Sequence, residues 1–110
     1  MFISPSELYI GTIESGQTIS ERFDIGTGNN FSVLIETLSA NGDISITYEC
    51  SRSYDGIYIS PASNVILNNC KVPVAKTFSP VLMQFVKIFI YNNGALPVDV
   101  GSYFMMQKES

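Results

Sequence analysis

The segment from Val81 to Tyr91 constrains the fold most, because its composition is typical of one β-strand that is apolar on both faces. β-branched and aromatic residues fill the segment, and Asn92-Asn93-Gly94 ends it. Alternation along the strand places Val86, Ile88 and Ile90 on one face and Phe85, Phe89 and Tyr91 on the other. Burial of both faces in a small antiparallel domain requires a second cover, either a long loop or another subunit.

Period-two segments recur along the rest of the chain, and no helical apolar period is sustained. Asn41-Gly42 and Asp55-Gly56 predict tight turns between such segments. Between Ser60 and Pro80 the alternation weakens, and we interpret this stretch as a long crossover that covers part of the sheet. The expected strands are residues 8–13, 19–25, 31–36, 44–50, 57–59, 65–67, 81–91 and 98–107.

Seven or eight short antiparallel strands with a long crossover predict an all-β fold, an antiparallel β-sandwich of jelly-roll or immunoglobulin-like type. We expect a single domain that spans residues 1–110. The expected core unites one face of the strongest strand with the apolar faces of two others. Its members are Val86, Ile88, Ile90, Ile44, Ile46, Tyr48, Phe31, Val33 and Ile35.

The amino-acid composition narrows the range of functions that this protein can have. Hydrophobic residues make up 45% of the chain and charged residues 15%, compared with about 25% charged residues in an average domain. The surface is therefore unusually neutral, and part of it is expected to be covered by a partner. The net charge is −4 and the six basic residues are scattered, which argues against nucleic acid as a partner.

The chain contains no histidine, so a Ser-His-Asp or Cys-His nucleophile is impossible. The carboxylates Asp43, Glu49, Asp55 and Asp99 lie beside turns or on strands with polar neighbours, as solvated residues do. We therefore expect no enzyme activity, no cofactor and no bound metal; calcium at Asp43 or Asp55 is the weaker alternative.

Cys50 and Cys70 are expected to be buried, reduced thiols, and a disulfide across the sandwich is the less favoured alternative. No apolar run approaches the roughly 20 residues of a membrane-spanning helix, and Met1–Pro5 lacks the features of a signal peptide. We expect a protein made in the cytoplasm, with no membrane partner.

Tyrosines form two candidate sites. Tyr103 and Met105 on the last strand join Phe85, Phe89 and Tyr91 as a candidate protein interface, because aromatic residues are common on such surfaces. Tyr54, Asp55 and Tyr58, at the Asp-Gly turn, form an alternative candidate loop for a glycan, since tyrosine combines a flat apolar face with a polar tip.

The order of these motifs is similar to that in known small sandwich proteins. The hairpin from Ile44 to Tyr58, the strand Phe85–Tyr91 with its Asn-Asn-Gly end, and the final strand ending Tyr103–Gln107 carry the resemblance. It resembles small virion proteins of tailed bacteriophages, of the capsid decoration and tail accessory type, and less strongly the galactose-binding-like carbohydrate modules. The absence of tryptophan and of an arginine pair counts against the second group.

The first resemblance implies a non-enzymatic structural protein of the virion. It would be a homo-oligomer that binds copies of itself and a larger shell of other virion proteins through apolar sheet surface. The alternative is a carbohydrate-binding module, with a glycan as its partner.

Overall fold

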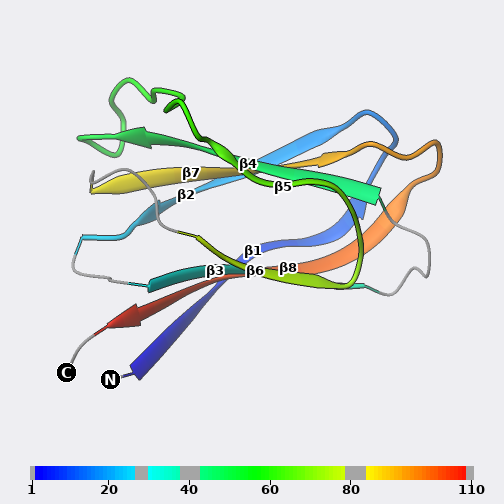
Figure 1. The fold of residues 1–110 in the computed structure, drawn as a ribbon, viewed down its shortest axis with the longest axis horizontal. Coiled ribbons are helices and arrows are strands. Elements are labelled where there is room, and N and C mark those ends of the chain that lie inside the picture. The colour runs from blue at the N-terminus through cyan, green and yellow to red at the C-terminus, as the bar shows by residue number, and fades with distance from the viewer. Residues whose placement is uncertain (1, 27–29, 38–42, 79–83, 109–110) are drawn as a thin grey trace.

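The computed structural model describes residues 2–26, 30–37, 43–78 and 84–108. Within them the chain forms eight β-strands in two stacked antiparallel sheets, which appear as two layers in Figure 1. One sheet has the order β1-β8-β3-β6 and the other β2-β7-β4-β5. The strands are β1 (Phe2–Ile13), β2 (Thr18–Asp24), β3 (Asn30–Thr37), β4 (Asp43–Ser51), β5 (Val65–Lys71), β6 (Val74–Phe78), β7 (Phe85–Asn92) and β8 (Val98–Lys108).

The pairing follows a simple rule that identifies the topology. β1 pairs with β8, β2 with β7, β3 with β6 and β4 with β5, always antiparallel. The two halves of the chain therefore run side by side and fold together into two sheets, as in a jelly roll. The predicted all-β antiparallel sandwich is confirmed, and of the two topologies expected it is the jelly roll.

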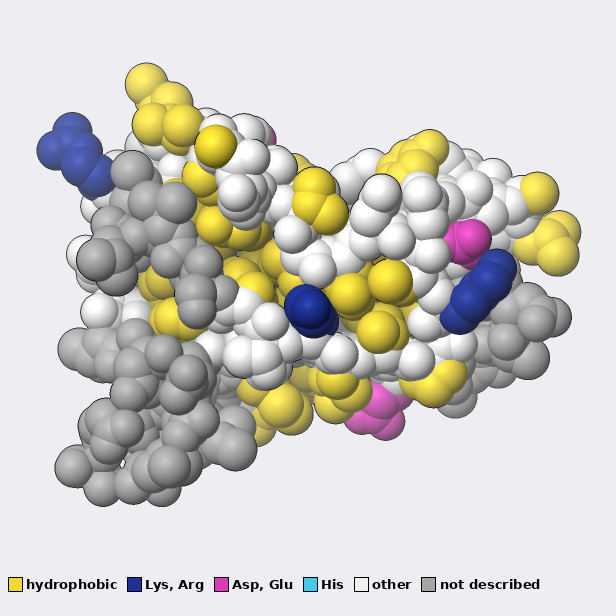
Figure 2. Space-filling model, in the orientation of Figure 1, with side chains coloured by type: hydrophobic (Ala, Val, Ile, Leu, Met, Phe, Trp, Pro, Cys, Tyr) yellow, Lys and Arg dark blue, Asp and Glu magenta, His cyan; other side chains and the backbone are white. Residues whose placement is uncertain are grey.

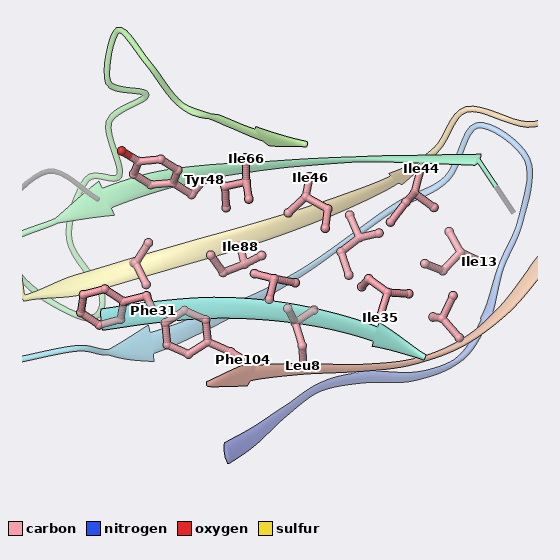
Figure 3. Packing of buried hydrophobic residues seen from close by; sticks show 14 of the residues in the cluster. Leu8, Ile13, Phe31, Ile35, Ile44, Ile46, Tyr48, Ile66, Ile88 and Phe104 are labelled. Carbon is pink, nitrogen blue, oxygen red and sulfur yellow. The ribbon is translucent and has the colours of Figure 1, made fainter. Parts of the chain in front are cut away.

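The core lies between the two sheets, as Figure 3 shows. Val86, Ile88 and Ile90 are fully buried, so the predicted facing of the strongest strand is correct. Phe104 from β8 stacks on Phe31 and Phe23, with ring centroids 5.9 and 4.5 Å apart. The other predicted core residues are buried as well: Ile44, Ile46, Tyr48, Phe31, Val33 and Ile35.

The prediction for residues 60–80 was correct in its strand at 65–67, which lies within β5, and in a crossover, but it missed β6 and the cover over the sheet is not formed. This stretch forms two strands, β5 and β6, which belong to different sheets, so the chain crosses from one layer to the other between Lys71 and Val74. Each strand adds an edge to its sheet and covers neither outer face. Lys71 and Lys76 are exposed on these edges, where charge opposes edge-to-edge pairing. Figure 2 shows this side of the molecule, with basic side chains among hydrophobic ones.

The predicted strand at residues 57–59 is not formed. Only Ile59 makes a β-bridge, with Cys50, and Tyr58 turns back so that its hydroxyl donates to the Tyr54 carbonyl over 2.8 Å. The turn at Asp55-Gly56 is confirmed, because the Gly56 amide donates to the Ser53 carbonyl. The Asn41-Gly42 turn and residues 81–83 of the strongest predicted strand lie outside the described residues.

Both cysteines are free thiols, and only Cys50 is fully buried, whereas Cys70 is half-buried. Cys70 pairs with Ile44, six residues from Cys50 along β4. At about 3.4 Å per residue the two thiols are roughly 20 Å apart, which is beyond the reach of a disulfide.

Candidate functional site

The five residues predicted to form one apolar interface lie on two opposite surfaces. Phe85, Phe89 and Tyr91 belong to β7 and point outward from β2-β7-β4-β5, a surface we call the β7 face. Tyr103 and Met105 belong to β8 and point outward from the other sheet, a surface we call the β8 face. Because the sheets stack through their inner faces, these two groups cannot contact one partner surface together.

The β8 face carries apolar side chains in adjacent rows, together with two exposed acidic residues, Glu7 opposite Tyr103 and Glu36 opposite Gly101. Tyr103 pairs with Leu34 on β3, and Ile10 on β1 pairs with Gly101, the neighbour of Tyr103 two residues back on β8. Ile10 is 56% exposed, and Leu34, Tyr103 and Met105 are half-buried. Gly101 leaves a hollow of about 180 Å³ beside Tyr103 and Ile10.

Ile10 and Leu34 belong to this surface although neither was predicted from the sequence to do so. The alternation in residues 31–36 places Leu34 on the outward side of its strand, so its position on this surface could have been predicted. Ile10 points outward because the β1–β8 register shifts between Glu7 and Tyr9. A β-bulge of this kind leaves no clear mark in a sequence.

On the β7 face, the loop between β4 and β5 folds back over one end of the sheet, at the upper left of Figure 1. The Arg22 guanidinium carbon lies 4.3 Å from the centroid of the Tyr54 ring, and Arg22 Nη1 donates to the Tyr54 carbonyl over 3.0 Å. Arg22 also pairs with Asp55 at 3.3 Å, and Tyr54 packs edge-on against Phe85 at 6.0 Å. The second cover required by the two-faced strand is therefore, at this end, the chain's own loop.

The predicted glycan loop of Tyr54, Asp55 and Tyr58 is brought together, but its members bind one another and Arg22. The Tyr58 hydroxyl donates to the Tyr54 carbonyl, and Lys87 Nζ lies 5.8 Å from the centroid of the Tyr58 ring. Burial raises the pKa of Tyr58 above its ordinary value of 10.0, against the opposing influence of Arg22. These contacts make the three residues a structural clamp over Phe85.

Beyond the clamp, the β7 face opens into a groove of about 250 Å³. Phe89 and Tyr91 form the aromatic part of its lining, and Tyr91 is 40% exposed. Polar side chains from β2, β4 and the segment before β5 surround these rings. They are Thr18, Ser45, Thr47, Glu49, Ser60 and Asn64.

A second hollow, of about 640 Å³, is lined by residues 51–53 and by Gly56, Ile57 and Ile59 at the outer side of the clamp loop. Ile57 is 84% exposed there. No set of three acidic or cysteine side chains in the described ranges gathers closely enough to hold a metal ion. Those ranges also contain no helix that is long and apolar enough to cross a membrane.

No protein-family model and no curated protein matches the sequence. Solved structures match the fold. The SPBc2 prophage-derived protein YomS has a TM-score of 0.55 at 13% identity, over 96% of this chain and 92% of its own. The low affinity xylan binding module CBM86 from Roseburia intestinalis has a TM-score of 0.54 at 12% identity, over 98% and 86%. CBM35 of Abf62 from Cellvibrio japonicus has a TM-score of 0.54 at 9% identity, over 96% and 95%.

At these identities the likeness establishes the β-sandwich fold and leaves the function open. Both groups that the sequence resembles have counterparts among the structural neighbours: a prophage-derived protein and carbohydrate-binding modules.

Proposed function

We propose that this protein is a non-catalytic structural subunit of a bacteriophage virion, of the capsid decoration or tail accessory type. It associates with copies of itself and with a larger shell of virion proteins through the β8 face. The likeness to a prophage-derived protein supports this proposal at the level of the fold. The observation that carries it is the cluster of apolar side chains on the β8 face, which remains partly exposed in the described chain. Its members are Ile10, Leu34, Tyr103 and Met105.

The size of this surface predicts weak association of the isolated protein. Covering the remaining exposed area of Ile10, Leu34, Tyr103 and Met105 contributes about 1 kcal/mol each. A symmetric dimer buries the same patch twice, for a total of roughly 8 kcal/mol. Loss of translational and rotational freedom opposes this with about 4–15 kcal/mol. Stable attachment therefore requires several contacts at once, as a repeating shell provides.

Sedimentation of the wild type and of Leu34→Glu over a range of concentrations tests the proposal. We expect the wild type to self-associate as its concentration rises, and the variant to remain a monomer because its charge lies in the centre of the patch. Thr47→Glu is the matched control, since it places the same charge at an outward strand position on the opposite face. Self-association that persists in Leu34→Glu and disappears in Thr47→Glu would refute the role of the β8 face.

A carbohydrate-binding module is the second candidate function, and the groove on the β7 face is the observation that favours it. Several structural neighbours are carbohydrate-binding modules, which is compatible with this function on the same fold. The clamp residues Tyr54, Asp55 and Tyr58 then serve as support for the groove. Binding of any glycan on an array would support this candidate, and an array with no positive spot would count against it.

A further inference from the structure

The groove on the β7 face differs from the other aromatic clusters of the molecule in having free ring surfaces. Tyr54 is occupied by Arg22 and Phe85, and Phe104 is occupied by Phe23 and Phe31. Tyr91 has no ring partner and no hydrogen bond among the described residues. The Phe89 ring has no aromatic partner among the same residues, and Lys87 Nζ lies 5.3 Å from its centroid.

Several polar groups around these rings are also unoccupied, whereas the Ser45 hydroxyl is engaged by Asn68, Asn69 and Asn93. The side chains of Thr18, Thr47 and Asn64 make no hydrogen bond to any described part of the chain. Glu49 accepts from Ser60 through Oε2 over 3.1 Å, and its second carboxylate oxygen has no partner within those same residues. Hydroxyl, amide and carboxylate groups thus surround two aromatic surfaces, with donors and acceptors free to bind a ligand.

The register gives the groove an ordered layout. Thr18, Tyr91 and Ser45 form one row across β2, β7 and β4, and Phe89 and Thr47 form the next. Tyr91 and Phe89 are two residues apart on β7, so the rows are separated by about 6.8 Å. The third row contains Arg22, Lys87 and Glu49, and of these three residues Glu49 lines the groove. At this row the clamp loop closes the groove, through Tyr58 above Lys87 and Ser60 beside Glu49.

We infer that this groove is a binding site for a neutral oligosaccharide, whose sugar rings lie over Tyr91 and Phe89. This inference rests on the second candidate function and gives it a site. The apolar faces of the sugars contact the two rings. Their hydroxyl groups hydrogen-bond with Thr18, Thr47, Asn64 and the free oxygen of Glu49. The Glu49 carboxylate in the lining disfavours an acidic ligand and so favours a neutral one, and the small volume admits only one or two sugar rings at a time.

The test is calorimetric titration of the intact chain with cellohexaose, xylohexaose and mannohexaose, each to about 10 mM, an upper limit set by the weak affinity expected of so small a contact. We expect the wild type to bind at least one of them. Tyr91→Ala should weaken binding about tenfold, the effect of losing one aromatic contact and its hydroxyl. Glu49→Gln should weaken it by a smaller factor. Tyr103→Ala is the matched control, because it removes the same side chain from the opposite face.

The outcomes distinguish a failure of the proposed groove from a failure of the carbohydrate-binding function. Loss of binding in Tyr91→Ala but not in Tyr103→Ala supports the groove. Binding that is unchanged in Tyr91→Ala and lost in Tyr54→Ala would overturn the groove while leaving a carbohydrate-binding function in place at the clamp loop. If none of the three hexasaccharides binds, the neutral-oligosaccharide site is overturned, and a positive glycan array would then be the sole support for the module. Circular dichroism of each variant shows that it is folded.

Discussion

Asn92, a buried polar side chain at the end of β7, is expected to contribute strongly to stability. It is 1% exposed, and its amide group makes three hydrogen bonds. Asn92 Nδ2 donates to the carbonyls of Ile13 and Leu96, both over 2.9 Å, and Oδ1 accepts from the Gly94 amide over 2.8 Å. One side chain therefore fastens the β7–β8 connection to the end of β1.

Replacement of Asn92 by alanine removes all three hydrogen bonds. Their backbone partners are then left without a hydrogen-bond partner, and the Ile13 carbonyl is affected most because its bond is buried. At about 1 kcal/mol net for each bond, we expect Asn92→Ala to lower the free energy of unfolding by about 3 kcal/mol. For a chain of this length that corresponds to a fall in Tm of roughly 12–24 °C.

Urea unfolding followed by circular dichroism measures this loss. Asn93→Ala is the matched control, because the neighbouring asparagine is exposed and its side chain makes one hydrogen bond, to Ser45. We expect the control to lose less than about 1 kcal/mol. Equal losses in the two variants would refute the argument that buried hydrogen bonds of Asn92 hold this end of the sandwich.

Three further predictions follow from packing and titration. Ile88→Ala should lower the free energy of unfolding by about 2–5 kcal/mol, whereas Phe89→Ala, on the outer face, should lower it less; chemical denaturation of both checks this, and the reverse order would contradict the facing of β7. Tyr58→Phe should reduce the loss of folding stability above pH 10, because the raised pKa of Tyr58 in the folded state means that stability falls as the pH rises through that pKa. Melting curves of the wild type and the variant at pH 7 and 11 test this, and an equal loss of Tm in the two proteins would count against it. In the native protein, a thiol reagent should modify Cys70 quickly and Cys50 only after unfolding, and the absence of reactive thiol before unfolding would be the opposing result.

The inner half of the sandwich could be predicted from the sequence, because burial on one side imposes a strict alternation. Val86, Ile88 and Ile90 illustrate this, since a shift of one residue would have exposed all three. β6 escaped prediction because Lys76 lies opposite Val33, at an inward position between Val74 and Phe78. An edge strand tolerates such a charge, which interrupts the apolar period that reveals a strand.

The candidate surfaces were harder to predict, because alternation shows which side chains share a face of a strand but not which sheet the strand joins. Tyr103 and Phe89 thus seemed to belong to one surface, although β8 and β7 lie in different layers. The clamp depends on Arg22 and Tyr54, which are 32 residues apart in the chain. No local sequence pattern predicts a contact over this separation. The loop that covers Phe85, and the groove beyond it, could therefore be found only in the three-dimensional structure.

The proposed function requires the β8 face to be the surface between protein copies. Amide NMR spectra of the labelled wild type over a dilution series test it most directly, because each shifted peak reports one residue. We expect concentration-dependent shifts on the β8 face, centred on Leu34 and Tyr103, with Tyr91 and the rest of the groove unchanged. Shifts confined to the β7 face, or spectra that do not change up to about 1 mM, would contradict this role of the β8 face.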